Sequence, residues 1–405
     1  MANVSSSNGL EKRPKLRFPG FDEPLEHKEL LHYLVENTAR NKQLKFGKEN
    51  VLSVSGEYGI VNQIAFQGRS FAGESVADYH VVETDDIVYT KSPLKANPYG
   101  IIKVNNGVPG IVSTLYAVYH PLKTVVPRFV DFYFSNNLRI NKFLKPLVNI
   151  GAKHDMKVNN TFVLTGTVVF PPLREQQKIV DFLTVLDRRI DIQRKKVEAL
   201  KKYKRGLLNQ IFSAISKGSQ RRKLRELVHV SGGKTPSMSN SLYWNGDIVW
   251  ISSKDMKSSR ISGSELKITN LALNEMMLYH PGTLLLVARS GILKHSLPLA
   301  ILEVDATINQ DIKALQVHGC NAFYLYYAIL SQEDNIIRTL VKTGTTVQSL
   351  MMDSFLNIEI PTPDIDLQQS IIDKLAKLEK YVDVQEEELS LLSQMRNGLL
   401  QQLLI

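Results

Sequence analysis

Several short segments combine Lys, Ser, Thr, Asn and Gly in a way that suits contact with a polyanion. Examples are residues 91–97 in the first half of the chain, and residues 232–237 and 252–257 in the second half. Lysine and arginine attract phosphates, while hydroxyl and amide groups bond to phosphates or base edges. We therefore expect nucleic-acid contacts from Lys91, Ser92, Lys95, Asn97, Lys153, Lys234, Thr235, Ser253, Lys254, Arg289, Lys294, Thr345, Thr346 and Gln348.

Two motifs that would indicate enzyme chemistry are incomplete. The triplet Gly233-Lys234-Thr235 lacks the earlier glycine of a phosphate-binding loop, because position 228 is Val. The triplet Asn97-Pro98-Tyr99 resembles an amino-methyltransferase tetrapeptide but continues with Gly100, and no glycine-rich cofactor turn precedes it. We expect no catalytic residue in this chain.

Histidine and cysteine usage predicts no metal site and a reducing compartment. The nine histidines are scattered without ligand spacing, and the single cysteine, Cys320, allows neither an intrachain disulfide nor a cysteine-based zinc site. Residues 1–15 are polar and basic, and the most apolar run, Thr283–Ala288, is too short to cross a bilayer. We expect a soluble cytoplasmic protein that binds no cofactor itself.

Length indicates two domains, and net charge favours a polyanionic partner. The chain has 405 residues, and 50 Lys and Arg against 40 Asp and Glu give a net charge of +10, which favours a polyanionic partner. Short apolar runs predict strands, and amphipathic patterns predict helices over Pro127–Leu144 and Phe323–Leu330. The predicted strands are Val51–Val54, Ile87–Tyr89, Ile101–Val104, Ile248–Ile251, Leu284–Val287 and Leu299–Val304.

An internal repeat organises these elements. Residues 176–212 match residues 368–404 without an insertion, beginning at Gln176-Gln177 and Gln368-Gln369. Prolines precede both copies, so each copy predicts a long helix of about 40 residues, roughly 60 Å in length. Such a helix cannot bury its apolar stripe alone, and its own repeat is the natural partner in a two-helix coiled coil.

The expected seam of this coiled coil has heptad spacing with matching polar breaks. Gln193 and Gln385 occupy equivalent positions, as do Lys204 and Arg396, and such breaks fix the register. The basic triplet 194–196 and the acidic triplet 386–388 favour the pairing. The alternative is two ordinary core helices of a duplicated domain. The seam residues are Leu183, Leu186, Ile190, Gln193, Val197, Leu200, Leu375, Leu378, Val382, Gln385, Leu389 and Leu392.

The stretches that open the two helices, Pro171-Pro-Leu-Arg-Glu-Gln-Gln-Lys-Ile179 and Pro361-Thr-Pro-Asp-Ile-Asp-Leu-Gln-Gln-Ser-Ile371, resemble the specificity subunit of type I restriction–modification systems. Further similar stretches are residues 16–21, 52–60, 233–237, 308–315 and 344–350. The second helix has Leu367 where the first has Glu175, which leaves open how its start is capped.

The resemblance implies an α+β protein with a pseudo-two-fold repeat. Two mixed α/β target recognition domains, 1–172 and 216–361, would be separated by spacer helices 173–215 and 362–405, which would form an antiparallel coiled coil. Each domain would recognise one half of a bipartite site in double-stranded DNA. The implied partners are two methylation subunits, which use S-adenosylmethionine, and two restriction subunits, which use ATP and Mg²⁺.

Two other classes stay open at this point. A coiled-coil scaffold could join proteins without recognising DNA, although the basic loops favour DNA. A fused methyltransferase or nuclease would need the cofactor and nuclease motifs that the sequence lacks.

Overall fold

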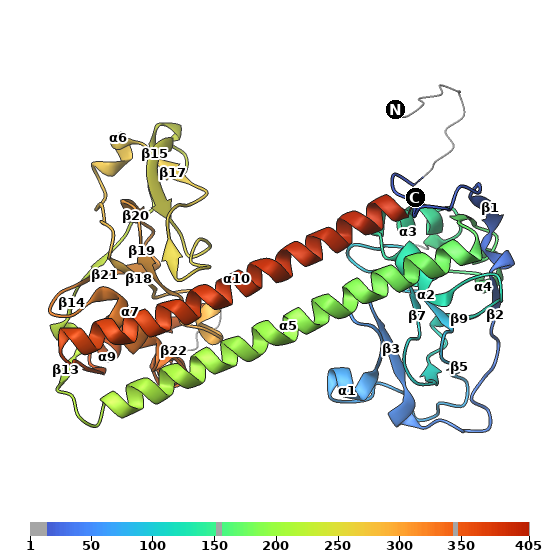
Figure 1. Cartoon of the computed structure of the whole chain (residues 1–405), viewed down its shortest axis with the longest axis horizontal. Coiled ribbons are helices and arrows are strands. Elements are labelled where there is room, and N and C mark those ends of the chain that lie inside the picture. Colours follow the sequence, from blue (N-terminus) through green and yellow to red (C-terminus); the bar gives the residue numbers. More distant parts are fainter. Residues whose placement is uncertain (1–13, 151–155, 343–346, 405) are drawn as a thin grey trace. The chain divides into compact units, whose positions relative to one another are not determined.

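The computed structural model describes residues 14–150, 156–342 and 347–404, which divide into two compact units. Unit 1 comprises Met1–Gln193 and Glu388–Ile405, and unit 2 comprises Arg194–Glu387. Each unit thus contains one module and a part of both long helices, α5 (Leu173–Ile215) and α10 (Ile365–Leu403) (Figure 1).

The module of unit 1 is built on an antiparallel sheet in the order β2-β9-β6-β7. Its central strand β6 (Ile87–Thr90) is buried throughout, which explains its unbroken apolar run. Strands β3–β4, β5–β8, β10–β11 and β1–β12 form separate antiparallel pairs. The remaining strands are β1 (Glu26–Glu29), β2 (Leu34–Glu36), β3 (Leu52–Ser55), β4 (Gly59–Asn62), β5 (His80–Val82), β7 (Ile102–Val104), β8 (Gly110–Val112), β9 (Tyr116–Pro121), β10 (Asn149–Ile150), β11 (Met156–Lys157) and β12 (Thr167–Phe170).

The single helix predicted over Pro127–Leu144 was wrong, because the segment forms two helices. Helix α2 (Pro127–Phe134) has its proline at the first turn, and α3 (Asn137–Leu144) follows a break at Ser135 and Asn136. The Asn136 side chain accepts a hydrogen bond from the Arg139 backbone N–H and so caps α3, a position that asparagine favours over a helix interior. The short helices α1 (Gln63–Gln67) and α4 (Asn160–Val163) complete this module.

Unit 2 repeats this strand order within a larger sheet, β14-β21-β18-β19-β16. In both sheets the four strands (β14, β21, β18 and β19 in unit 2) stand in the same spatial order relative to the chain: the first strand in sequence lies beside the last, followed by the second and the third. A three-stranded sheet, β17-β15-β20, pairs β15 with β20 in parallel. The strands are β13 (Arg221–Lys223), β14 (Val228–Gly232), β15 (Trp244–Ile251), β16 (Arg260–Ile261), β17 (Lys267–Ile268), β18 (Leu284–Val287), β19 (Leu299–Leu302), β20 (Ala306–Ile308), β21 (Ile312–Val317), β22 (Val341–Lys342), β23 (Ser349–Leu350) and β24 (Glu359–Pro361).

The helices of unit 2 besides α5 and α10 are α6 (Asn270–Leu273), α7 (Ala322–Leu330), α8 (Glu333–Leu340) and α9 (Met352–Phe355). Helix α7 confirms the helix predicted over Phe323–Leu330. The six predicted strands are confirmed as β3, β6, β7, β15, β18 and β19, with ends that differ by a few residues.

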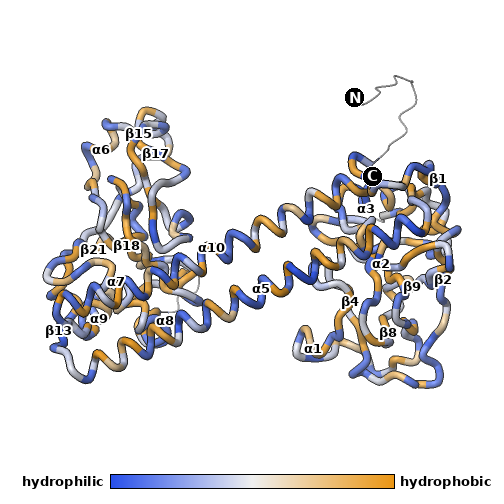
Figure 2. Tube along the Cα trace, in the orientation of Figure 1, coloured by the Kyte–Doolittle hydropathy of each residue, from blue (hydrophilic) through white to orange (hydrophobic). Residues whose placement is uncertain are grey.

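The long helices are amphipathic and are built into the module cores. Figure 2 shows apolar and polar residues alternating along α5 and α10. Leu183, Leu400 and Leu403 belong to the main core of unit 1. Leu208 and Leu375 belong to the main core of unit 2. Each module therefore folds onto both helices as one hydrophobic unit.

Within each unit, α5 and α10 run antiparallel. In unit 1, Arg189 lies 3.3 Å from Glu388, and Asp187 pairs with Arg396, so the residue number falls along α5 as it rises along α10. The pairs of unit 2 show the same reversal, namely Lys201–Glu386 and Lys204–Glu379. In the described part of the chain, no helix is both long and apolar enough to cross a membrane.

Candidate nucleic-acid interface and spacer

The predicted loop 232–237, which follows β14, is bonded to β15 and to the end of β20 in unit 2. The Lys234 backbone N–H donates to Ile308 O at 3.0 Å, and the Trp250 indole donates to Lys234 O at 3.1 Å. A Cβ at Gly233 would lie 1.9 Å from Ile308 O, so only glycine permits this approach. The rigid backbone presents the exposed side chains of Lys234 and Thr235 to solvent.

A second group of predicted residues lies beside the first. The Arg289 backbone N–H donates to Asp311 O at 3.3 Å, and the Ser290 N–H donates to Gln348 O at 3.0 Å. Arg289 is exposed, and its backbone also forms an isolated β-bridge to Ser349. The loop that includes Ile308 and Asp311 thus joins the Lys234 loop to the Arg289 loop.

Gln310 belongs to this surface, although the sequence did not single it out. The Thr235 hydroxyl donates to Gln310 Oε1 at 2.5 Å, and both side chains are exposed. Its position in residues 308–315, one of the stretches similar to the restriction family, was the available signal. We call Lys234, Thr235, Arg289, Gln310 and Gln348 the strand-end surface of unit 2.

The other predicted residues of unit 2 lie on neighbouring loops. Ser253 and Lys254 follow β15 directly, where Ser252 is held by hydrogen bonds to the Asp255 carboxylate at 2.7 and 2.8 Å. Lys294 is exposed at the end of the turn that starts after Ser290. Thr345 and Thr346 lie outside the described residues.

In unit 1 the predicted residues follow β6 and divide into exposed and anchored positions. Ser92 and Lys95 are exposed. Lys91 is half-buried, its ammonium donates to Asn160 Oδ1 at 3.3 Å, and burial lowers its pKa. Lys153 lies outside the described residues.

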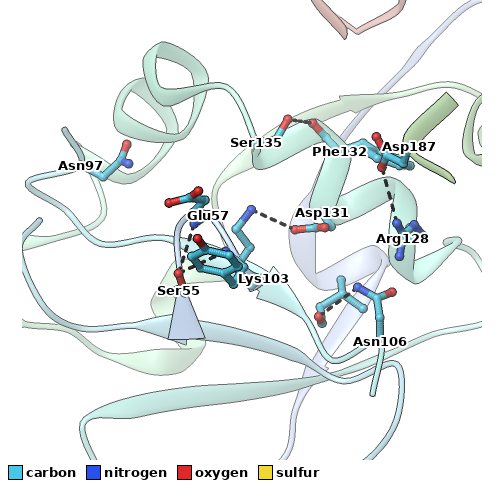
Figure 3. A network of polar contacts seen from close by, with 12 residues as sticks. Ser55, Glu57, Asn97, Lys103, Asn106, Arg128, Asp131, Phe132, Ser135 and Asp187 are labelled. Atoms are coloured by element: carbon cyan, nitrogen blue, oxygen red, sulfur yellow. Dashed lines mark hydrogen bonds and ion pairs between the residues drawn. The ribbon is translucent and has the colours of Figure 1, made fainter. Parts of the chain in front are cut away.

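Asn97 is buried, with 8% of its surface exposed, and its amide donates to Asn137 Oδ1 at 3.0 Å. It lines a hollow of about 250 Å³ together with Glu57 and Lys103, which pairs with Asp131 at 3.3 Å (Figure 3). A direct contact of Asn97 with DNA would need this loop to open, so its role in the interface stays a prediction.

The predicted seam residues are buried or half-buried along α5 and α10. Leu200, Leu378, Leu389 and Leu392 are half-buried. The others are buried, namely Leu183, Leu186, Ile190, Gln193, Val197, Leu375, Val382 and Gln385.

The charged seam positions are satisfied by acidic partners on the opposite helix. Arg396 pairs with Asp187 in unit 1, and Lys204 pairs with Glu379 in unit 2. Asp187 and Glu379 are themselves equivalent positions of the repeat, so the two ion pairs are copies of one another. The sequence predicted the basic members only, because Asp187 and Glu379 lie outside the heptad positions that were assigned to the seam.

The two long helices begin differently at the position where the repeat is broken. In unit 1, Glu175 is 2% exposed and accepts two hydrogen bonds from Arg17, at 2.9 and 2.5 Å. In unit 2, the Asp364 carboxylate accepts from the Leu367 backbone N–H at 2.8 Å and caps α10. Leu367 therefore needs no counterpart of Arg17.

Among the described residues, no group of three or more His, Cys, Asp or Glu side chains could hold a metal ion. Burial raises the pKa of Cys320 to about 11, which disfavours its thiolate at neutral pH.

Comparison with curated proteins gives partial matches. Over 160 residues the chain is 38% identical to the EcoR124I/EcoR124II specificity subunit of Escherichia coli, covering 38% of this chain and 40% of that protein. Over 173 residues it is 29% identical to the MjaIX specificity subunit of Methanocaldococcus jannaschii, covering 41% of this chain and 39% of that protein. The chain thus spans about two fifths of the length of these relatives.

Comparison with solved structures shows the same fold over nearly the whole chain. The type I restriction–modification S subunit from M. genitalium has a TM-score of 0.58 at 13% identity, covering 97% of this chain and 99% of that one. A chain from a study of assembly and conformational transition in the type I R-M system has a TM-score of 0.56 at 16% identity, covering 93% and 96%.

The family model named type I restriction modification DNA specificity domain matches residues 73–202 and residues 216–394. These two matches cover most of both modules and most of both long helices. The chain therefore belongs to the type I restriction–modification DNA specificity family.

Proposed function

We propose that this chain is the non-catalytic specificity subunit of a type I restriction–modification complex in the cytoplasm. Each module would recognise one half of a bipartite DNA site, and the helices would set the gap between the halves. The observation that carries this proposal is the strand-end surface of unit 2, where polar and basic side chains project from loops whose backbones are bonded to one another. Such side chains can contact both phosphates and base edges.

Methylation subunits would bind to the long helices. Outside the seam, each unit exposes apolar side chains on these helices. Exposing apolar surface to water is unfavourable, and such patches mark sites of protein–protein contact. In unit 1 they include Phe182, Val185, Ile192, Leu391 and Met395, and in unit 2 Tyr203, Tyr381 and Val384. Because the repeat makes the two units similar, two copies of one partner suit them. S-adenosylmethionine would belong to these partners, and ATP and Mg²⁺ to two restriction subunits.

The test is reconstitution with a cognate methylation subunit. Alone, the chain should neither methylate nor cleave DNA. With the partner and S-adenosylmethionine, adenine methylation should appear at one bipartite sequence, detected by sequencing modified bases. Methyl transfer by the chain alone would contradict the proposal. A stable complex that methylates without sequence preference would instead favour the alternative of a protein-joining scaffold.

A further inference from the structure

The repeated glutamine at the start of each long helix joins that helix to its module. In unit 1, Gln176 is 1% exposed. Its Oε1 accepts from the Val126 backbone N–H at 3.0 Å, and its Nε2 donates to Pro171 O at 2.9 Å. Val126 is the N-cap residue of α2, so the side chain of Gln176 ties the first turn of α5 to the start of a module helix.

Unit 2 contains the same arrangement at the equivalent position. Gln368 is 4% exposed, its Oε1 accepts from the Asn321 backbone N–H at 2.9 Å, and its Nε2 donates to Pro363 O at 2.8 Å. Asn321 is the N-cap residue of α7. The two modules therefore make the same pair of glutamine hydrogen bonds at the start of their long helices. Stability alone would not require both modules to use the same contact.

A second contact lies about three helical turns further along each long helix, roughly 16 Å away at 1.5 Å per residue. In unit 1, Asp187 of α5 lies 3.6 Å from Arg128 of α2. In unit 2, Glu379 of α10 accepts from the Tyr327 hydroxyl of α7 at 3.1 Å. Each long helix therefore contacts its module helix at two points, and together they restrain how the module helix lies against it.

We infer that Gln176 and Gln368 are positioning residues that set the tilt of each module on the spacer, and so set which gap between half-sites is accepted. This inference rests on the proposed function. A module of about 160 residues has a radius of gyration of about 15 Å, which corresponds to a sphere of about 20 Å radius, so a tilt of about 10° moves a point about 20 Å from the pivot by about 3.5 Å. That displacement is close to one base pair, roughly 3.4 Å.

The test replaces both glutamines by methionine, which keeps the volume and removes the hydrogen bonds. The matched control is the double variant Gln177→Met and Gln369→Met. These neighbours are exposed, and their amides donate to Asp181 and Asp373 on their own helices, at 2.8 and 2.9 Å. Full-length variants would be assembled with the methylation subunit, and the gap at every methylated site would be sequenced.

In the Gln176→Met and Gln368→Met variant, both half-site sequences should persist. Methylation at gaps one base pair longer or shorter should rise about three- to tenfold relative to the original gap, because each module loses the one hydrogen bond that ties its helix start, at Val126 or Asn321, to the long helix. The control should keep the original distribution. An unchanged distribution in a folded Gln176→Met and Gln368→Met complex would overturn the inference.

A second measurement separates this inference from the proposed function. Spin labels at Ser92 and Ile192, both exposed in unit 1, would report the distance between module and helix in a Cys320→Ser background. Gln176→Met should broaden this distance distribution, and Gln177→Met should not. If the wild-type complex shows no bipartite preference, the proposed function fails while the label result still decides the positioning role. Equal widths in both variants would contradict that role.

Discussion

Breaking the buried ion pair between Lys204 and Glu379 should destabilise unit 2. The Glu379 side chain is 9% exposed and that of Lys204 is 23% exposed, so the pair is largely removed from water. Replacing Lys204 by methionine leaves the buried Glu379 carboxylate with its hydrogen bond from the Tyr327 hydroxyl but without its cation. Breaking a fully buried pair costs about 3–5 kcal/mol, and the partial exposure of Lys204 reduces our expectation to about 2–3 kcal/mol.

The coupling between the two residues comes from a double-mutant cycle. Glu379→Gln keeps an acceptor for Tyr327 and should cost about 1 kcal/mol, because the Lys204 ammonium can reach solvent. In the double variant no charge is left unpaired, so its loss should be smaller than the sum of the single losses. The expected coupling energy is about 2 kcal/mol.

The pH dependence gives this prediction a second signature. Burial and the neighbouring Glu379 raise the pKa of Asp383, while Lys204 lowers it. A carboxyl whose pKa is raised on folding contributes stability at low pH and loses it as the pH rises. The penalty of Lys204→Met should therefore be larger at neutral pH than near pH 4, roughly the ordinary carboxyl range.

Urea unfolding of the full chain, followed by circular dichroism, measures these free energies. Lys202→Met, an exposed lysine of the same helix, is the control and should change stability by less than about 0.5 kcal/mol. A coupling energy below about 0.5 kcal/mol would refute the reasoning, as would an equal loss in the control. Either result would mean that the pair is solvated and does not fix the seam.

Three further predictions concern DNA recognition by the assembled complex. Arg289→Ala or Lys254→Ala should weaken binding by about 1–3 kcal/mol if the residue contacts a base edge; footprints unchanged in both variants would remove them from the interface. Replacing residues 216–361 with the second module of another family member should change one half-site only, and sequencing that finds both halves altered would contradict independent recognition. A heptad inserted into both helices, near Val197 and Leu389, should lengthen the gap by about three base pairs. A constant gap with methylation intact would mean that the spacing is set elsewhere.

The internal repeat by itself was enough to predict both long helices and to predict that they pair with each other. Heptad spacing after proline requires an amphipathic helix, and two matching copies identify the surface that each can bury. The strands were predictable for a similar reason, because runs such as Ile87–Tyr89 must be buried on both faces. The break at Ser135 and Asn136 was missed because the apolar pattern continues across it. The side chain of Asn136 caps α3 and so starts a new helix there.

Only the tertiary structure decided which polar residues share a surface and which hold the fold together. Asn97 and Ser92 look alike as loop residues, yet one is buried against Asn137 and the other faces solvent. Gln310 joins Thr235 through a contact between distant segments, and no local pattern encodes that distance. Likewise, the repeated glutamines were visible in the sequence, but their contacts to the starts of α2 and α7 depend on how each module packs. Periodicity reports what one element must bury, whereas the pairing of side chains far apart in the chain is set only when those elements meet.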